Sequence, residues 1–100
     1  MKNKQQFVTN SNVMEAFNSL NVDAPVIDTQ HLRKCKAYVM VMDNHYLLIS
    51  YKTLVAFIDK RTRICYDILR YNYGYTPTSA QHIAKFCHDY GAVSCLVYRP

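Results

Sequence analysis

Four short segments rich in β-branched and aromatic residues follow one another between Lys36 and Leu69, separated by turn-forming residues at intervals of 8–10 residues. Such spacing is typical of strands that pair with their neighbours in sequence. It predicts a four-stranded antiparallel meander. The predicted strands are KAYVMVM at 36–42, HYLLISY at 45–51, LVAFID at 54–59 and RICYDIL at 63–69.

Polar residues mark the three turns. Asp43 and Asn44 tolerate a positive φ, and we expect the other turns at Lys52-Thr53 and at 60–62. The segment HYLLISY has apolar residues at both odd and even positions, so both faces of this strand would be apolar. This pattern predicts either a central strand covered on both faces or a strand with one face that binds a partner, such as a second copy of the chain.

A short amphipathic helix is expected before the strands. Asn12 with Glu15 forms a capping box, and apolar residues then follow at helical spacing as far as Leu20. Pro25 keeps the helix from continuing. Residues 1–11 have no periodicity and are predicted to form a flexible tail, which leaves 12–100 as a single domain.

A second helix is expected over residues 79–90, where Thr78 and Gln81 form another capping box and Gly91 follows the last turn. Its predicted buried stripe is Ala80, Ile83, Ala84, Phe86, Cys87 and Tyr90. The final segment AVSCLVYR, at 92–99, is a fifth strand. The expected fold is α+β, in the order α-β-β-β-β-α-β.

The composition fits one compact domain. Half of the 100 residues are hydrophobic, and 19% are charged. No apolar run reaches the 18 or so residues of a membrane span, and the polar opening lacks the apolar centre of a secretory signal. We therefore expect a cytoplasmic protein.

The four cysteines are separated by 29, 21 and 7 residues and form no C-x-x-C pair. Each lies in an apolar segment, where a free thiol packs as a small hydrophobic group. The sequence favours buried thiols, although two disulfides are compatible with a count of four. The cysteines are Cys35, Cys65, Cys87 and Cys95.

No arrangement typical of catalysis or of metal binding is evident. Cys87 and His88 are adjacent, but neighbouring helical side chains point about 100° apart. His82 and His88 lie six residues apart and cannot chelate together, so surface histidines are expected, with His31 and His45 left to tertiary folding. The carboxylates lie mostly at turns, and no pair suited to acid–base catalysis stands out. The two glycines are isolated and do not form a phosphate-binding loop. We therefore expect that the protein is not an enzyme and binds no metal or cofactor. The cysteine and histidine side chains are expected to be scattered, without forming a site.

Positive charge concentrates in the middle of the chain. Residues 31–70 hold eight lysines and arginines against three aspartates, and the isoelectric point is about 9.1. An anionic partner such as nucleic acid would explain this excess. So would a strand-rich domain that uses cations to protect its sheet edges from aggregation.

The richest stretch is KRTRICYDILRYNYGY at 60–75, where arginines alternate with tyrosines. Guanidinium groups bind phosphates, and phenol rings stack on unpaired bases. The same residue types also form hot spots in protein interfaces, or the rings can pack beneath a helix. The predicted binding residues are Arg61, Arg63, Arg70, Tyr71, Tyr73 and Tyr75.

Two segments resemble a pattern in small uncharacterised phage and prophage proteins, in which SY-x-T-x-VA precedes Y-S-x-T-T-S-x-H-I. Pro77 stands where Thr is more common. The matching residues are Ser50, Tyr51, Thr53, Val55, Ala56, Tyr75, Thr78, Ser79, His82 and Ile83.

The resemblance implies a phage accessory protein, a class that includes inhibitors of host defence such as anti-CRISPR proteins. The expected function is therefore inhibition of a nucleic-acid-targeting nuclease by binding, with a host protein or ribonucleoprotein as the partner. Contact with RNA or DNA, or formation of a homodimer, is compatible with this expectation. The alternative functions are a nucleic-acid-binding regulator of phage genes or an enzyme that uses Cys87, His82 or His88.

Overall fold

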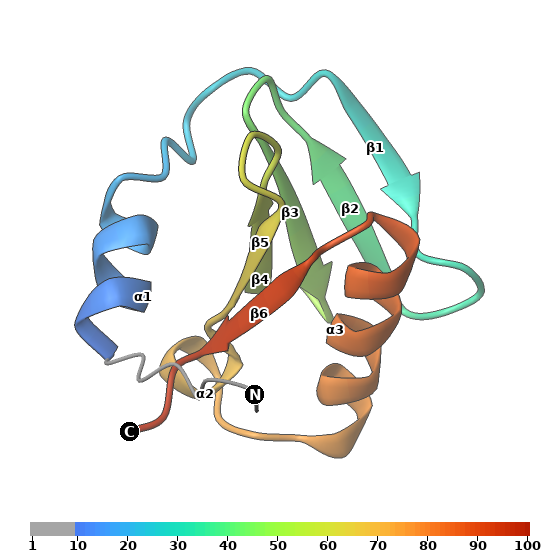
Figure 1. Ribbon diagram of the computed structural model, residues 1–100. Coiled ribbons are helices and arrows are strands. Elements are labelled where there is room, and N and C mark those ends of the chain that lie inside the picture. Colours follow the sequence, from blue (N-terminus) through green and yellow to red (C-terminus); the bar gives the residue numbers. More distant parts are fainter. Residues whose placement is uncertain (1–9) are drawn as a thin grey trace, which may run out of the picture.

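The structure, a computed structural model, describes residues 10–100. It is an α+β fold with a six-stranded mixed sheet and three helices (Figure 1). Within the described residues, no helix is both long and apolar enough to cross a membrane. In chain order the elements are α1 (Asn10–Asn18), β1 (Asp28–His31), β2 (Ala37–Val41), β3 (His45–Ser50), β4 (Thr53–Asp59), β5 (Ile64–Asp67), α2 (Leu69–Asn72), α3 (Pro77–Asp89) and β6 (Ser94–Val97).

The strands lie in the sheet in sequence order, β1 to β6. The predicted meander corresponds to β2–β5, but β1 was not predicted, so the sheet has one more strand than expected. The β1 segment DTQH is exposed throughout and has no apolar alternation. It extends the sheet because it pairs antiparallel with β2, from Asp28 opposite Val41 to His31 opposite Tyr38.

The last strand pairs parallel with β5, with Cys65 directly opposite Cys95. Parallel neighbours need a crossover connection, which α2 and α3 provide here. The short helix α2 also differs from the prediction, in which the fourth strand ran on to Leu69. The strand ends at Asp67, whose Oδ1 accepts a hydrogen bond from the Leu69 N–H at 3.0 Å.

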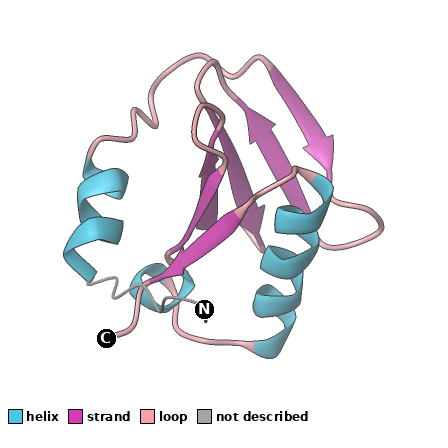
Figure 2. Ribbon diagram, in the orientation of Figure 1, coloured by secondary structure: helices cyan, strands magenta, loops and turns pink. Residues whose placement is uncertain are grey.

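The sheet is the middle layer, with α1 against one face and α3 against the other (Figure 2). In β3, Leu47 packs with the α1 side and Leu48 with the α3 side, and both are buried. The apolar segment HYLLISY is therefore a central strand covered on both faces within the chain.

Both long helices begin earlier than predicted. Asn10 starts α1, and its side chain exchanges hydrogen bonds with the backbone of Arg99. The predicted tail therefore ends before Asn10, and residues 1–9 lie outside the described part. Thr76, rather than Thr78, caps α3 by accepting a hydrogen bond from the Ser79 N–H at 3.2 Å.

The predicted buried stripe of α3 is partly wrong. Ile83 and Phe86 are buried as expected, but Ala84 is exposed. Ser79 and His82 are buried instead. The side of α3 that packs on the sheet therefore includes polar residues as well as the apolar residues that were expected.

Candidate functional site

The structure places the six predicted binding residues in two groups. Arg61 and Arg63 belong to the turn between β4 and β5, whereas the other four lie on α2 and its connection to α3. The strand β5 lies between the groups, which are at its opposite ends (Figure 1). Its four residues alone span roughly 13 Å.

Helix α2 has a fixed position on the sheet. The Asn72 side-chain amide donates to the carbonyl of Leu54 at 2.9 Å, which holds the helix against the start of β4. Gly74 ends the turn with a φ of +104°, a backbone conformation that glycine adopts without strain, and its N–H donates to the carbonyl of Leu69. The end of α2 is therefore anchored on the sheet beside the exposed tyrosines.

Three predicted tyrosines are exposed at this end of the sheet. Tyr71 packs edge-on against Tyr98, with ring centroids 5.2 Å apart, while Tyr73 and Tyr75 are more than half exposed. The guanidinium of Arg70 lies over the ring of Tyr75, 4.6 Å from its centroid. The rings of Tyr73 and Tyr75 are therefore at the surface, whereas the half-exposed ring of Tyr71 also packs edge-on against Phe17 of α1.

The turn between β3 and β4 adds a tyrosine and a lysine that the sequence did not single out. Tyr51 and Lys52 have φ values of 49° and 73°, so the turn lies one residue earlier than predicted. This left-handed backbone conformation has a free-energy cost of roughly 1–2 kcal/mol for each residue other than glycine. The Tyr51 N–H donates to the carbonyl of Lys36, which brings a further cation beside the turn.

We call this surface the tyrosine end of the sheet. Of the five exposed tyrosines, it holds four, and the fifth is Tyr38 on β2. Its residues are Lys36, Tyr51, Lys52, Arg70, Tyr71, Tyr73, Tyr75 and Arg99.

The tyrosine end carries positive charge. Among residues 36, 51–52, 67–76 and 98–99 there are four lysines and arginines and a single acidic residue, Asp67. The Asp67 side chain is half-buried, and burial raises the pKa of its carboxyl group. Four cations therefore outnumber the one carboxyl group at this end of the sheet.

The surroundings of Arg63 include an acidic residue. Arg63 lines a hollow of about 410 Å³ together with Lys60 and Asp89. Arg33 forms an ion pair with Asp89 at 2.7 Å and holds the pKa of that carboxyl well below its usual range. Asp89 is thus paired with Arg33, and Lys60 and Arg63 are the other charged residues that line the hollow.

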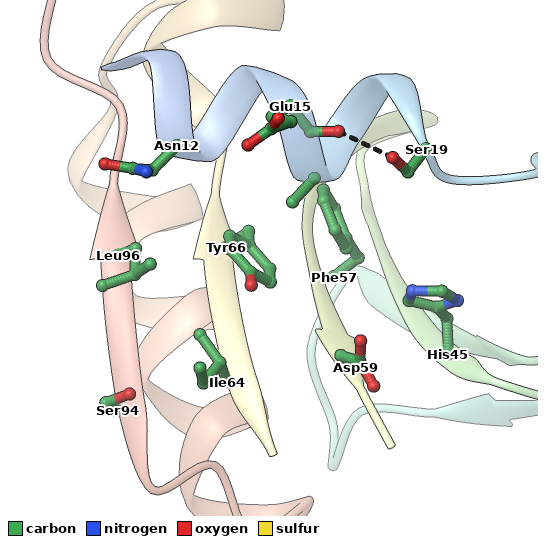
Figure 3. A pocket seen from close by; sticks show the side chains of 11 residues that line it. Asn12, Glu15, Ser19, His45, Phe57, Asp59, Ile64, Tyr66, Ser94 and Leu96 are labelled. Carbon is green, nitrogen blue, oxygen red and sulfur yellow. Dashed lines mark hydrogen bonds between the residues drawn. The ribbon is translucent and has the colours of Figure 1, made fainter. Parts of the chain in front are cut away.

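A larger groove of about 740 Å³ lies between α1 and the sheet (Figure 3). Phe57 and Tyr66 stack at its base, with ring centroids 5.1 Å apart, and Glu15 and Asp59 line it. His45 also lines the groove, and burial lowers the pKa of its ring. Two carboxyl side chains and neither lysine nor arginine are among the described residues that line the groove, so it does not suit a phosphate group.

A buried polar cluster joins β3 to α3. The Ser50 hydroxyl lies 2.9 Å from Nδ1 of His82 and 3.0 Å from the hydroxyl of Ser79. His82 is only 4% exposed, so the prediction of a surface histidine is wrong. Ser50, at 2% exposed, has a base beside it but no access for a substrate. This cluster is therefore a structural link.

The cysteine side chains are not scattered through the fold, contrary to the prediction. Cys65, Cys87 and Cys95 bring their sulfur atoms within 4.8 Å of one another. None of the four cysteines forms a disulfide, but only Cys65 is fully buried, and Cys95 is exposed. The sequence could not reveal this cluster, because it depends on the parallel pairing of β5 with β6. His88 points away into solvent, as its helical position predicted.

Comparison with known proteins gives a family but no characterised relative. No curated protein and no solved structure shows a significant match to the chain. A family model matches residues 1–95, which is nearly the whole sequence. The chain therefore belongs to the DUF8033 family, a family of unknown function.

Proposed function

We propose that this chain is a non-enzymatic binding protein that inhibits a host nucleic-acid-targeting nuclease, in the manner of an anti-CRISPR protein. The tyrosine end is its contact surface. The observation that carries the proposal is the collection of four exposed tyrosines and four cations on α2 and the adjoining turns and loops at one end of the sheet. The phage origin and the inhibitor class come from the sequence resemblance.

The chemistry of the surface suits a partner that carries nucleic acid. Exposed phenol rings stack on unpaired bases, and neighbouring lysines and arginines bind the phosphates. Arg70 is held over Tyr75, so it reaches a phosphate from a preformed position. A guide RNA bound to a nuclease offers both features. A net positive charge argues against imitation of DNA, so the inhibitor covers a nucleic-acid or acidic surface instead.

Strain at the turn between β3 and β4 supports the same surface. Tyr51 and Lys52 both adopt positive φ values, where asparagine and glycine would be favoured. Backbone strain of this kind concentrates at binding and catalytic sites. Arg33 and Arg63 adopt the same conformation elsewhere, so what is particular to this turn is that a tyrosine and a lysine occupy it at the end of the sheet where α2 lies.

Binding to purified CRISPR effectors tests the proposal. A panel of effectors, each with and without guide RNA, is immobilised and exposed to the wild-type chain, to Arg70→Gln and to Arg61→Gln/Arg63→Gln. We expect capture by a guide-loaded effector that falls about tenfold or more with Arg70→Gln and much less with the double variant. Equal losses would extend the contact to the β4–β5 turn. Absence of binding to every effector would refute the inhibitor role.

The second candidate is a nucleic-acid-binding regulator of phage genes, which the acid-poor tyrosine end also favours. Such a regulator binds free RNA or DNA, and its affinity falls steeply with salt as counterions are released. Gel shifts with the purified chain at low and at physiological salt distinguish the two. A shift of free nucleic acid, combined with no effect on any effector, would favour the regulator.

A further inference from the structure

Three cysteines from three different elements meet beside the edge of the sheet. Cys65 on β5 lies opposite Cys95 on β6, and Cys87 approaches both from α3. Their three sulfur atoms lie within 4.8 Å of one another. Core packing alone accounts for Cys65, but Cys87 is half-buried and Cys95 is exposed.

This spacing is close to that of a thiolate metal site. A Zn–S bond is about 2.3 Å long, so the sulfur atoms of a tetrahedral site stand about 3.8 Å apart. Each pair of sulfurs therefore needs to close by no more than about 1 Å. Side-chain rotation alone can supply such a movement, with no change in the backbone of β5, β6 or α3.

We propose that Cys65, Cys87 and Cys95 bind a single Zn²⁺ ion per chain, with the fourth coordination position open to water at the sheet edge. The strand β6 is an edge strand, and the exposed Cys95 gives the ion an entry path. Three protein ligands plus a water molecule is an established coordination for zinc, and thiolates favour zinc over magnesium or calcium.

The electrostatics of the cluster are consistent with a bound cation. A cysteine loses its proton when it binds zinc, so each of the three ligands brings one negative charge to the site. Asp67 lies two residues beyond Cys65 on the same face of β5 and adds negative charge nearby. A divalent cation offsets part of this negative charge.

The fourth cysteine provides a matched control. Cys35 lies outside the cluster, and its sulfur accepts a hydrogen bond from Lys85 Nζ at 3.4 Å. A cation beside this thiol disfavours a metal ion there. Replacing Cys35 with serine therefore removes a thiol without touching the proposed site.

Metal titration of the reduced, full-length chain tests the proposal. Co²⁺ serves as the spectroscopic probe, because Co²⁺–thiolate bonds give charge-transfer absorption, and Zn²⁺ should displace it. We expect one equivalent of Co²⁺ to bind wild-type chain and Cys35→Ser. Cys87→Ser and Cys95→Ser should lose this absorption and weaken Zn²⁺ binding by tenfold or more.

Circular dichroism of each metal-free variant establishes that it is folded, and Cys95→Ser, at an exposed position, is the substitution that the fold tolerates best. A wild-type chain that binds no Co²⁺ or Zn²⁺ would overturn the proposal. So would binding that survives in folded Cys87→Ser and Cys95→Ser, because the ion would then be held elsewhere. The site makes no use of the tyrosine end, so either proposal can fail alone.

Discussion

The Ser50 hydroxyl lies 2.9 Å from Nδ1 of His82, and this contact fixes the end of β3 to the middle of α3. The two residues are 32 positions apart in sequence. Ser79 completes the cluster through its own hydroxyl. This buried polar link lies beside the turn between β3 and β4, where Tyr51 lies against the His82 ring.

Replacing Ser50 with alanine should destabilise the fold. The change leaves His82 and Ser79 without a buried partner, and each such loss costs about 1–3 kcal/mol. The measurement is urea unfolding followed by circular dichroism. Ser94→Ala, at an exposed serine of β6, is the control and should change stability by less than about 0.5 kcal/mol. Equal stabilities of the two variants would contradict the structural role of the cluster.

The buried imidazole should make stability depend on pH. Burial lowers the pKa of His82 from its ordinary value of 6.5, and the charge of Lys85 adds to this effect. As the pH falls below 6.5, the unfolded chain takes up this proton before the folded chain does. The free energy of unfolding should therefore be largest above pH 6.5 and decline below it.

His82→Gln removes this part of the pH dependence. The variant is less stable than wild type at neutral pH, but its stability should decline less between pH 6.5 and about 5. Because burial also lowers the pKa of His45, a smaller decline should remain in the variant. Urea midpoints at several pH values measure both slopes. Parallel curves for variant and wild type would show that His82 does not titrate in this way.

Glycine at position 52 should stabilise the fold. Lys52 has a φ of 73°, so Lys52→Gly relieves the left-handed strain and should raise the free energy of unfolding by up to about 1 kcal/mol. Lys34→Gly, in a loop position without positive φ, serves as the control and should be neutral or slightly destabilising. If the turn is strained for the sake of binding, Lys52→Gly should also weaken capture of the partner.

Contact with single-stranded RNA through the tyrosine end predicts a defined salt dependence. Four phosphate contacts at about −0.7 each give a slope of roughly −3 for the logarithm of the association constant against that of salt concentration. Arg70→Gln should reduce the slope by about 0.7, whereas Arg61→Gln should not. A slope near zero would mean that the surface contacts protein instead.

The sequence allowed prediction of the elements whose burial alternates along the chain. The strand at 45–50 carries Leu47 and Leu48 towards opposite faces, so its apolar pattern indicated a central position. By contrast, DTQH at 28–31 has no apolar residue and forms a strand only because β2 provides hydrogen-bonding partners. Local sequence does not contain that information.

The candidate site was predictable in part for the same reason. Tyr73 and Tyr75 lie close in sequence to Arg70, so their shared surface could be inferred from spacing. Tyr51 joins them only through the packing of α2 on the start of β4. Arg61 and Arg63 are also close to Arg70 in sequence, but the four residues of β5 separate these two arginines from the tyrosines in the structure.

Inhibition of a guide-loaded nuclease by chains that differ only in exposed tyrosines tests the central claim most directly. The variant Tyr73→Ser/Tyr75→Ser removes two rings from the tyrosine end, while Tyr38→Ser removes an exposed ring from β2. Both should fold, because none of these rings belongs to the buried core. We predict that the double variant loses inhibition by tenfold or more and that Tyr38→Ser retains it. Undiminished inhibition by the folded double variant would contradict the assignment of this surface.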